Sequence, residues 1–225
     1  RLNNTPAGKF DHIEGNYFVG KEAGLSNNDG LGNIAIGNSA LNKNISSAWN
    51  IALGDSALYS FKGGLGENIA IGRNTLRSDT SGYLNIAIGG YSLYLNSSGK
   101  YNIAIGINSL YLNTEGDFNT GLGAQTLNKN TTGYENVAIG MGSLAFNTTG
   151  YQNTGVGRDA LRRNTDGYSN TAVGTNSLFY NSGGLFNSAL GQEALYKNTT
   201  GFLNTATGYW ALYENTTGVS NTALG

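Results

Sequence analysis

The sequence predicts an all-β chain that folds as a parallel β-solenoid (a β-roll) of about 12 coils. Three observations predict this fold: a pattern with a 17-residue period, a short strand-like segment in each copy, and corner-forming residues at fixed places between those segments. Gly accounts for 35 of the 225 residues and Asn for 32, whereas charged residues make up only 12%. A typical soluble domain has about 7% Gly and about 25% charged residues, so this composition already points away from ordinary globular folds.

The pentad Asn-x-Ala-x-Gly defines the repeat. Its copies follow one another at a constant 17-residue spacing, with one 18-residue step from Asn50 to Asn68. The copies start at Asn16, Asn33, Asn50, Asn68, Asn85, Asn102, Asn119, Asn136, Asn153, Asn170, Asn187, Asn204 and Asn221. The consensus is N-[IT]-A-[ILV]-G-x-x-[AST]-L-x-x-N-x-x-G-x-x, and we number its positions 1 to 17. Residues 16–225 therefore form the repeat region, and residues 1–15 are expected to be a cap or a junction to a preceding domain.

Each copy is expected to contain two short strands and two corners. Positions 1–5 form an alternating segment rich in β-branched residues, which favours a strand. A helix is excluded because two Gly residues recur in each copy, and each interior Gly costs about 1 kcal/mol relative to Ala. Positions 8–11 are expected to form the second strand. Asn at position 12 and Gly at positions 5 and 15 are expected to form the corners, where they tolerate φ > 0. Stacked coils would align Asn with Asn in ladders.

The expected core is thin. Ile, Leu or Val at position 4 and Leu at position 9 are the two large apolar columns, while positions 3 and 8 carry small residues. Position 2 is Ile in the early copies and mostly Thr in the later ones. Positions 2 and 4 share one face of a strand, and position 3 points the other way. Because apolar side chains then lie on both faces of a thin coil, we expect one side to be buried against other copies of the chain.

The repeats resemble a known family. Units such as NIAIGINSLYLNTEGDF from Asn102 and NTATGYWALYENTTGVS from Asn204 look like the Asn-Thr-Ala-x-Gly repeats of bacterial and phage fibre proteins. In those proteins the repeats often precede an endosialidase-type intramolecular chaperone domain. The pentad is also similar to the head repeats of trimeric autotransporter adhesins, which have a shorter unit. The resemblance implies a homotrimer of parallel β-rolls, displayed on a cell surface or virion and used for attachment to a host or prey receptor.

Several other function classes are disfavoured. The chain has no Cys, which excludes disulfides and thiolate metal sites. A net charge of −1 without a basic cluster disfavours nucleic-acid binding. No apolar run approaches the length that spans a membrane. The G-x-G-x-x-A matches at 30–35 and 155–160 arise from the repeat and open no helix, so no nucleotide cofactor is expected. The calcium-binding G-G-x-G-x-D repeat is absent, so no metal column is expected.

Catalytic residues are not evident. His12 is the only histidine, and without a second His or any Cys it favours a surface or cap role. Asp159 and Asp166 lie in one copy, and Glu193 and Glu214 lie in adjacent copies at different positions. No pair with the spacing of about 5 to 10 Å that glycosidases use is therefore apparent. We expect no enzyme activity, with a glycan depolymerase as the weakest alternative.

Aromatic residues give the best indication of binding. One column precedes the pentad and comprises Tyr83, Tyr101, Phe118, Tyr134, Tyr151, Tyr168, Phe186 and Phe202. A second follows Leu and comprises Tyr59, Tyr94, Tyr111, Phe146, Phe179, Tyr180, Tyr196 and Tyr213. Both columns are expected to be stacking ladders or chain interfaces, with a platform for sugars as the alternative. Trp49, Tyr209 and Trp210 stand outside both columns and are the candidate binding residues.

The favoured function is a non-enzymatic extracellular fibre or adhesin segment, either shaft or head, that mediates attachment to a cell surface or glycan. The alternative is a glycan- or ice-binding solenoid. In that case the aromatic residues or the Thr column at position 2 would form the binding surface; the Thr column comprises Thr154, Thr171, Thr205 and Thr222.

Overall fold

The computed structural model describes residues 8–11 and 14–225. The chain divides into two compact units, residues 1–115 and 116–225. Each unit is a parallel β-solenoid in which every 17-residue coil contributes one strand to a sheet. The described residues make about 12 coils in all, so the predicted fold class is confirmed.

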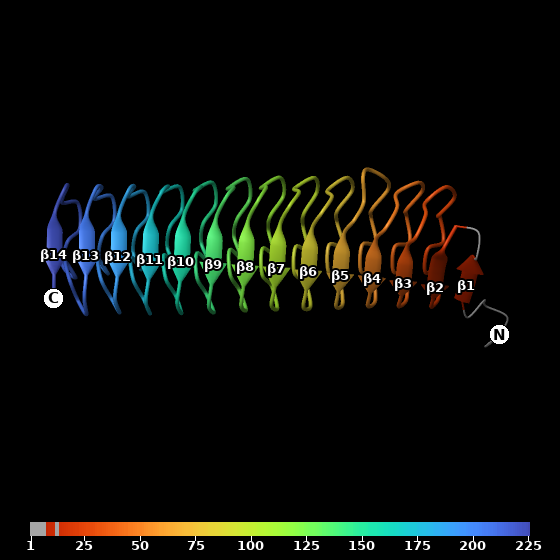
Figure 1. Ribbon diagram of the computed structural model, residues 1–225, viewed down its shortest axis with the longest axis horizontal. Helices are drawn as coiled ribbons and strands as arrows, with labels where there is room; N and C mark the ends of the chain where they lie inside the picture. Colours follow the sequence, from red (N-terminus) through yellow and green to blue (C-terminus); the bar gives the residue numbers. More distant parts are fainter. Residues whose placement is uncertain (1–7, 12–13) are drawn as a thin grey trace. The chain divides into compact units, whose positions relative to one another are not determined.

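In the first unit the strands lie side by side in chain order (Figure 1). The parallel strands are β2 (Asn16–Val19), β3 (Ile34–Ile36), β4 (Ile51–Leu53), β5 (Ile69–Ile71), β6 (Ile86–Ile88) and β7 (Ile103–Ile105). Each residue pairs with the residue at the same repeat position in the next coil, as Ile34 does with Ile51. Strand β1 (Gly8–Asp11) pairs with β2 in the antiparallel direction and covers the edge of the first coil. The assignment of residues 1–15 to a cap or junction stays a prediction.

The second unit repeats this arrangement with parallel strands in chain order. These strands are β8 (Thr120–Leu122), β9 (Val137–Ile139), β10 (Thr154–Val156), β11 (Thr171–Val173), β12 (Ser188–Leu190), β13 (Thr205–Thr207) and β14 (Thr222–Leu224). The register again follows the repeat, with Val156 opposite Val173 and Thr205 opposite Thr222. The constant spacing of the repeat in this unit therefore fixes which residues become neighbours.

The strand residues alternate between the interior and an outer face. Ala at position 3 is fully buried in coil after coil, as at Ala52, Ala104 and Ala172. Positions 2 and 4 point outward and remain partly or largely exposed in the single chain. The expectation that position 4 fills the core is therefore wrong. The interior is narrow, and Leu at position 9 fills it from the opposite wall, which leaves room only for a methyl group at position 3.

The expected second strand is absent from the described coils. Positions 6–11 form a series of turns instead, in which residues at positions 7 and 9 adopt positive φ. Leu at position 9 has φ between 47° and 52° in every coil that carries it. The backbone still bonds to the next coil, since the Leu161 N–H donates to the Ser177 carbonyl at 2.9 Å and the Arg163 N–H to the Phe179 carbonyl at 3.0 Å. The left-handed residues at positions 7 and 9 turn each Leu side chain inward. Positive φ is disfavoured for Leu because it is a bulky non-Gly residue.

The two Gly positions are needed for different reasons. Gly at position 5 has φ between 107° and 138°, as expected for a corner. Gly at position 15 was also expected to be needed for positive φ. This expectation is wrong, because φ is not positive at position 15 except at Gly64 in the 18-residue coil. A Cβ on Gly150 would lie 2.4 Å from both the Asn147 Oδ1 and the Gly167 carbonyl oxygen. Position 15 therefore requires Gly because an Asn ladder packs directly against its Cα.

The Asn ladders predicted from the repeat are present in both units. At position 1, the backbone N–H and the Nδ2 of Asn153 both donate to the Oδ1 of Asn136, at 3.0 and 3.2 Å. At position 12, Asn164 Nδ2 donates to Asn147 Oδ1 at 2.7 Å and to the Gly167 carbonyl at 2.9 Å. These side chains are fully buried, and each satisfied bond contributes about 1 kcal/mol.

The position-12 ladder of the first unit is interrupted at Phe61. Phe61 is fully buried, and it offers no amide to the coil before it. As a result the Oδ1 of Asn44 is a buried acceptor without a donor. The next member of the column is Asp79, whose carboxylate accepts bonds from the Gly82 N–H at 2.7 Å and from Asn96 Nδ2 at 3.1 Å. The departures at Phe61 and Asp79 therefore form one local defect rather than two separate ones.

A second pair of departures is compensatory. The first coil has Phe18 where other coils have Ala or Gly at position 3, and Gly24 where they have Leu at position 9. Phe18 is buried, and a Cβ on Gly24 would lie 2.5 Å from its ring. The Phe18 ring thus occupies the space that Leu fills elsewhere.

Candidate functional site

The outer face of the sheet carries different residue types in the two units. In the first unit it carries two rows of large apolar side chains, Ile34, Ile36, Ile51, Leu53, Ile69, Ile71, Ile86, Ile88, Ile103 and Ile105. All are at least partly exposed in the single chain, with Ile36 at 46% and Ile105 at 39%. In the second unit, position 2 is mostly Thr, and Thr171, Thr205 and Thr222 are exposed. The first unit therefore presents the more apolar face.

The aromatic columns are stacked in part. In the second unit, Tyr151 lies between Tyr134 and Tyr168, with ring centroids 4.9 and 4.7 Å apart and interplanar angles of 4°. These three occupy position 16, and packing between its neighbours raises the pKa of Tyr151. The column before the pentad does not continue as one stack, because Phe186 at position 17 meets Tyr168 edge-on. After Leu, Tyr196 stacks on Tyr213 at 5.0 Å.

The three candidate binding residues lie in different places on the repeat. Trp49 belongs to the first unit, at position 17, and is 61% exposed beside Gly32. Tyr209 and Trp210 belong to the second unit, at positions 6 and 7, and are 58% and 52% exposed. Their rings stack at 4.9 Å, and Trp210 Nε1 donates to Glu193 Oε2. Tyr209 and Trp210 thus form an aromatic patch, while their role in binding stays a prediction.

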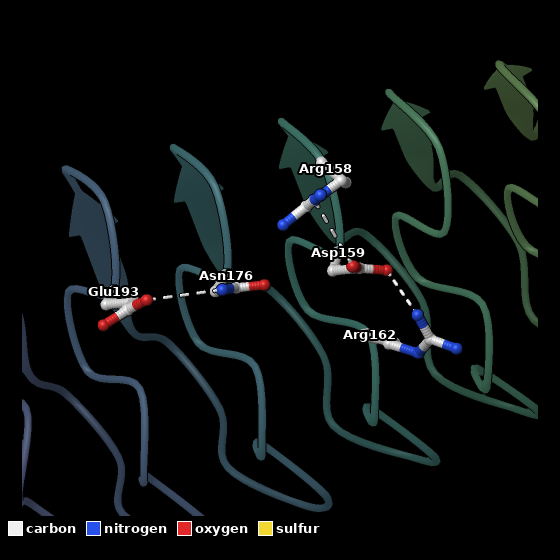
Figure 2. Close-up of polar contacts among 5 residues, drawn as sticks. All are labelled: Arg158, Asp159, Arg162, Asn176 and Glu193. Atoms are coloured by element: carbon white, nitrogen blue, oxygen red, sulfur yellow. Dashed lines mark hydrogen bonds and ion pairs between the residues drawn. The ribbon is translucent and has the colours of Figure 1, made fainter.

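Polar residues at positions 6, 7 and 10 form a strip along the second unit. Figure 2 shows Asp159 between two arginines: Asp159 Oδ1 accepts from Arg162 Nη1 at 2.5 Å, and Asp159 Oδ2 lies 3.8 Å from Arg158 Nε. Farther along, Asn176 Nδ2 donates to Glu193 Oε1 at 3.4 Å (Figure 2). Arg162 is therefore paired with an acid, and it also lies over the Phe146 ring at 5.7 Å.

A groove of about 410 Å³ lies entirely on the second unit. One wall consists of position-11 side chains, Phe146, Arg163 and Tyr180, and the other of position-13 hydroxyl residues, Thr165, Ser182 and Thr199. The groove thus crosses four consecutive coils. Phe146 is 44% and Tyr180 is 37% exposed, so ring surface is available to a ligand. Arg163 lies over the Tyr180 ring at 5.1 Å and near the Phe179 ring at 6.0 Å.

Sequence reasoning missed this groove. In the sequence, Phe146 and Tyr180 fall among the aromatic residues that follow Leu, where positions 10 and 11 look like one column. Separating them by repeat position reveals that Arg163 stands between two aromatics at position 11. The position-13 hydroxyls look like ordinary turn residues in the sequence.

In the part of the chain that the structure describes, no three His, Cys, Asp or Glu side chains gather as metal ligands. His12 lies outside the described residues. Likewise, within residues 8–11 and 14–225 no helix is long and apolar enough to cross a bilayer. Burial raises the pKa of Asp79 strongly, to about 7, and this acid is enclosed in the position-12 ladder.

Comparison of the chain with protein-family models, with curated proteins and with solved structures found no match. The repeat chemistry and the surfaces described above are therefore the basis for a functional proposal.

Proposed function

We propose that this chain is a non-enzymatic segment of an extracellular fibre or adhesin, displayed on a cell surface or virion, that attaches to a receptor on another cell. In this proposal three chains assemble in parallel as a homotrimer. The observation that carries it is the apolar outer face of strands β3–β7, which a single chain leaves exposed. Attachment outside the cell and the number three come from the resemblance to bacterial and phage fibre repeats.

The apolar face favours self-association for an energetic reason. Burying apolar surface contributes about 25 cal/mol per Å², and soluble monomers rarely expose large contiguous apolar patches. Ten Ile and Leu side chains in two rows make such a patch on the first unit. Identical chains that run parallel bring identical rows together in register, and rotational symmetry allows every copy to bury the same face. A second copy of the chain is therefore the occupant that fits this surface best.

Oligomeric state tests this proposal. Sedimentation equilibrium of the whole chain is expected to give a trimer. Ile86→Asp would place a charge in the apolar interface, so it is expected to weaken association at least 100-fold, or about 3 kcal/mol. Ser98→Asp, which adds the same charge at an exposed position-14 residue, is expected to leave the trimer intact. A wild-type chain that stays monomeric at high concentration would refute the assembly.

The ice-binding alternative is favoured by one observation. Position-2 residues of the second unit form an in-register row in which Thr171, Ser188, Thr205 and Thr222 are exposed. If this row binds ice, the chain should show thermal hysteresis in a nanolitre osmometer. Thr171→Tyr should then reduce it severalfold because the larger side chain breaks the flat row, whereas Thr200→Tyr, an exposed change at position 14, should not. A freezing point equal to the melting point would eliminate this alternative.

A further inference from the structure

We propose that position 11 of the second unit binds an acidic polysaccharide that carries one carboxylate or sulfate per disaccharide. At position 11 the second unit carries Lys129, Phe146, Arg163, Tyr180, Lys197 and Glu214, and we assign the site to the first five, one residue from each of five consecutive coils. Phe146, Arg163 and Tyr180 form one wall of the groove on this unit. The inference rests on the proposed attachment function and names the class of receptor.

Cations and aromatics alternate along the row. Stacked coils are about 4.8 Å apart, so successive cations recur roughly every 10 Å, close to the length of one disaccharide. The two aromatics between these cations, Phe146 and Tyr180, keep part of their ring surface exposed, although Arg162 lies over the Phe146 ring and Arg163 over the Tyr180 ring. Aromatic faces pack against the C–H faces of pyranose rings, while cations pair with the acid groups. The period of the protein therefore matches a linear polymer in which charged and uncharged sugars alternate.

Arg163 is the centre of the site because its charge is available. Its neighbour Arg162 is paired with Asp159 at 2.5 Å, on the polar strip shown in Figure 2. In the described part of the chain, no carboxylate lies within ion-pair distance of Arg163, and its side-chain contacts are with the rings of Phe179 and Tyr180. These contacts hold the guanidinium plane in place and leave its N–H groups free to bind a carboxylate in bidentate fashion.

The two flanking cations, Lys129 and Lys197, differ in how available their charges are to a ligand. Lys129 is exposed on the coil before Phe146. Lys197 pairs with Glu214 at 2.7 Å, but both side chains are largely exposed, and such surface pairs contribute little and exchange readily. We therefore assign the main charge contact to Arg163 and a supporting one to Lys129.

The opposite wall supplies hydrogen-bond acceptors. Ser182 Oγ donates its proton to the Thr199 carbonyl at 3.2 Å, and Thr199 Oγ1 donates to the Thr216 carbonyl at 3.1 Å. Thr165 Oγ1 lies 3.0 Å from the Ser182 carbonyl and 3.1 Å from Asp166 Oδ1, and its single proton goes to one of them. Because their protons are engaged, these oxygens can serve a sugar hydroxyl only as acceptors. A polysaccharide offers both the acid groups and the hydroxyl donors that the two walls require.

The test is calorimetric titration of the whole chain with a hyaluronan decasaccharide, which carries one carboxylate per disaccharide. Binding is expected, and it should weaken as salt rises. Arg163→Ala and Tyr180→Ala should each weaken binding at least 10-fold. Arg158→Ala removes an exposed arginine from the neighbouring polar strip and should change the affinity less than 2-fold. Circular dichroism of each variant verifies that the fold is retained.

Other outcomes overturn the assignment. Equal binding of a neutral malto-oligosaccharide of the same length would show that the charge row plays no part. Equal or tighter binding of a single-stranded oligonucleotide would assign the row to a nucleic acid instead. A trimer that binds none of these ligands refutes the position-11 site and leaves the fibre proposal standing. A monomer that binds hyaluronan through Arg163 supports the site and refutes the proposed assembly.

Discussion

Replacing Gly89 by Ala is expected to lower the free energy of unfolding by about 4 kcal/mol or more. Gly89 occupies position 5 with φ of 114°, where an L side chain is strained. A Cβ there would also lie 2.8 Å from the carbonyl carbon of Gly106 on the next coil. Since the obstructing atoms belong to the backbone, no side chain can rotate away, and the coils themselves would have to separate.

The adjacent Gly90 provides a matched control for this prediction. A Cβ on Gly90 would meet only the Arg73 carbonyl oxygen, at an ordinary contact distance of 3.9 Å. Gly90→Ala is therefore expected to cost nothing, and it can stabilise by up to about 1 kcal/mol because Ala restricts the unfolded chain. Urea unfolding of the two variants, followed by circular dichroism, measures the difference. Equal stability of Gly89→Ala and Gly90→Ala would contradict the close approach of the coils.

The stability of the chain is expected to fall as pH rises from about 4 to about 8 because of Asp79. Burial raises the pKa of Asp79 from 3.8 to about 7, although hydrogen bonds from Gly82, Asn96, Ser81 and Thr80 oppose the shift. A group with a raised pKa in the folded state binds its proton more tightly there than in the unfolded chain. Its contribution is therefore fully present below about pH 4 and is lost by about pH 8. The loss amounts to about 4 kcal/mol, since one pH unit between the two pKa values corresponds to about 1.4 kcal/mol.

Asp79→Asn isolates this effect, because Asn is the residue that the position-12 column carries in most coils. Urea unfolding at about pH 4, 6 and 8 is expected to show a stability difference between the variant and the wild-type chain that grows with pH in favour of the variant. Ionisable groups elsewhere affect both proteins alike and cancel in the difference. A difference that stays constant over this range would show that Asp79 titrates near its ordinary value in the folded chain.

The repeat made much of the fold predictable. A fixed repeat length specifies that identical positions become neighbours, so the parallel register and the Asn ladders follow from the sequence. The conformation of positions 6–11 does not follow, because positive φ at Leu contradicts local preference and arises only from packing between coils. The role of Gly150 was likewise hidden, since it depends on how close an Asn side chain approaches from the same coil.

The candidate sites were less predictable than the fold. Trp49, Tyr209 and Trp210 were predicted as binding residues because they stand outside the two aromatic columns, and all three are exposed. The groove instead involves Phe146, Arg163 and Tyr180, which resemble unrelated residues until they are aligned by repeat position. Compensation between Phe18 and Gly24 was also invisible, because each departure looks like an independent loss of consensus until the two are seen in contact.

The left-handed residues at positions 7 and 9 have a consequence for how the chain reaches its folded state. Each such residue costs on the order of 1 kcal/mol when it stands alone, and the compensating hydrogen bonds are made to the neighbouring coils. An isolated coil therefore has no stable structure, and the first pair of coils is a high-energy nucleus. Each further coil that folds onto this nucleus then lowers the free energy, as in a one-dimensional Ising model with nearest-neighbour coupling. Truncated chains should consequently show a threshold length for folding, above which the free energy of unfolding rises by a constant increment for each added coil.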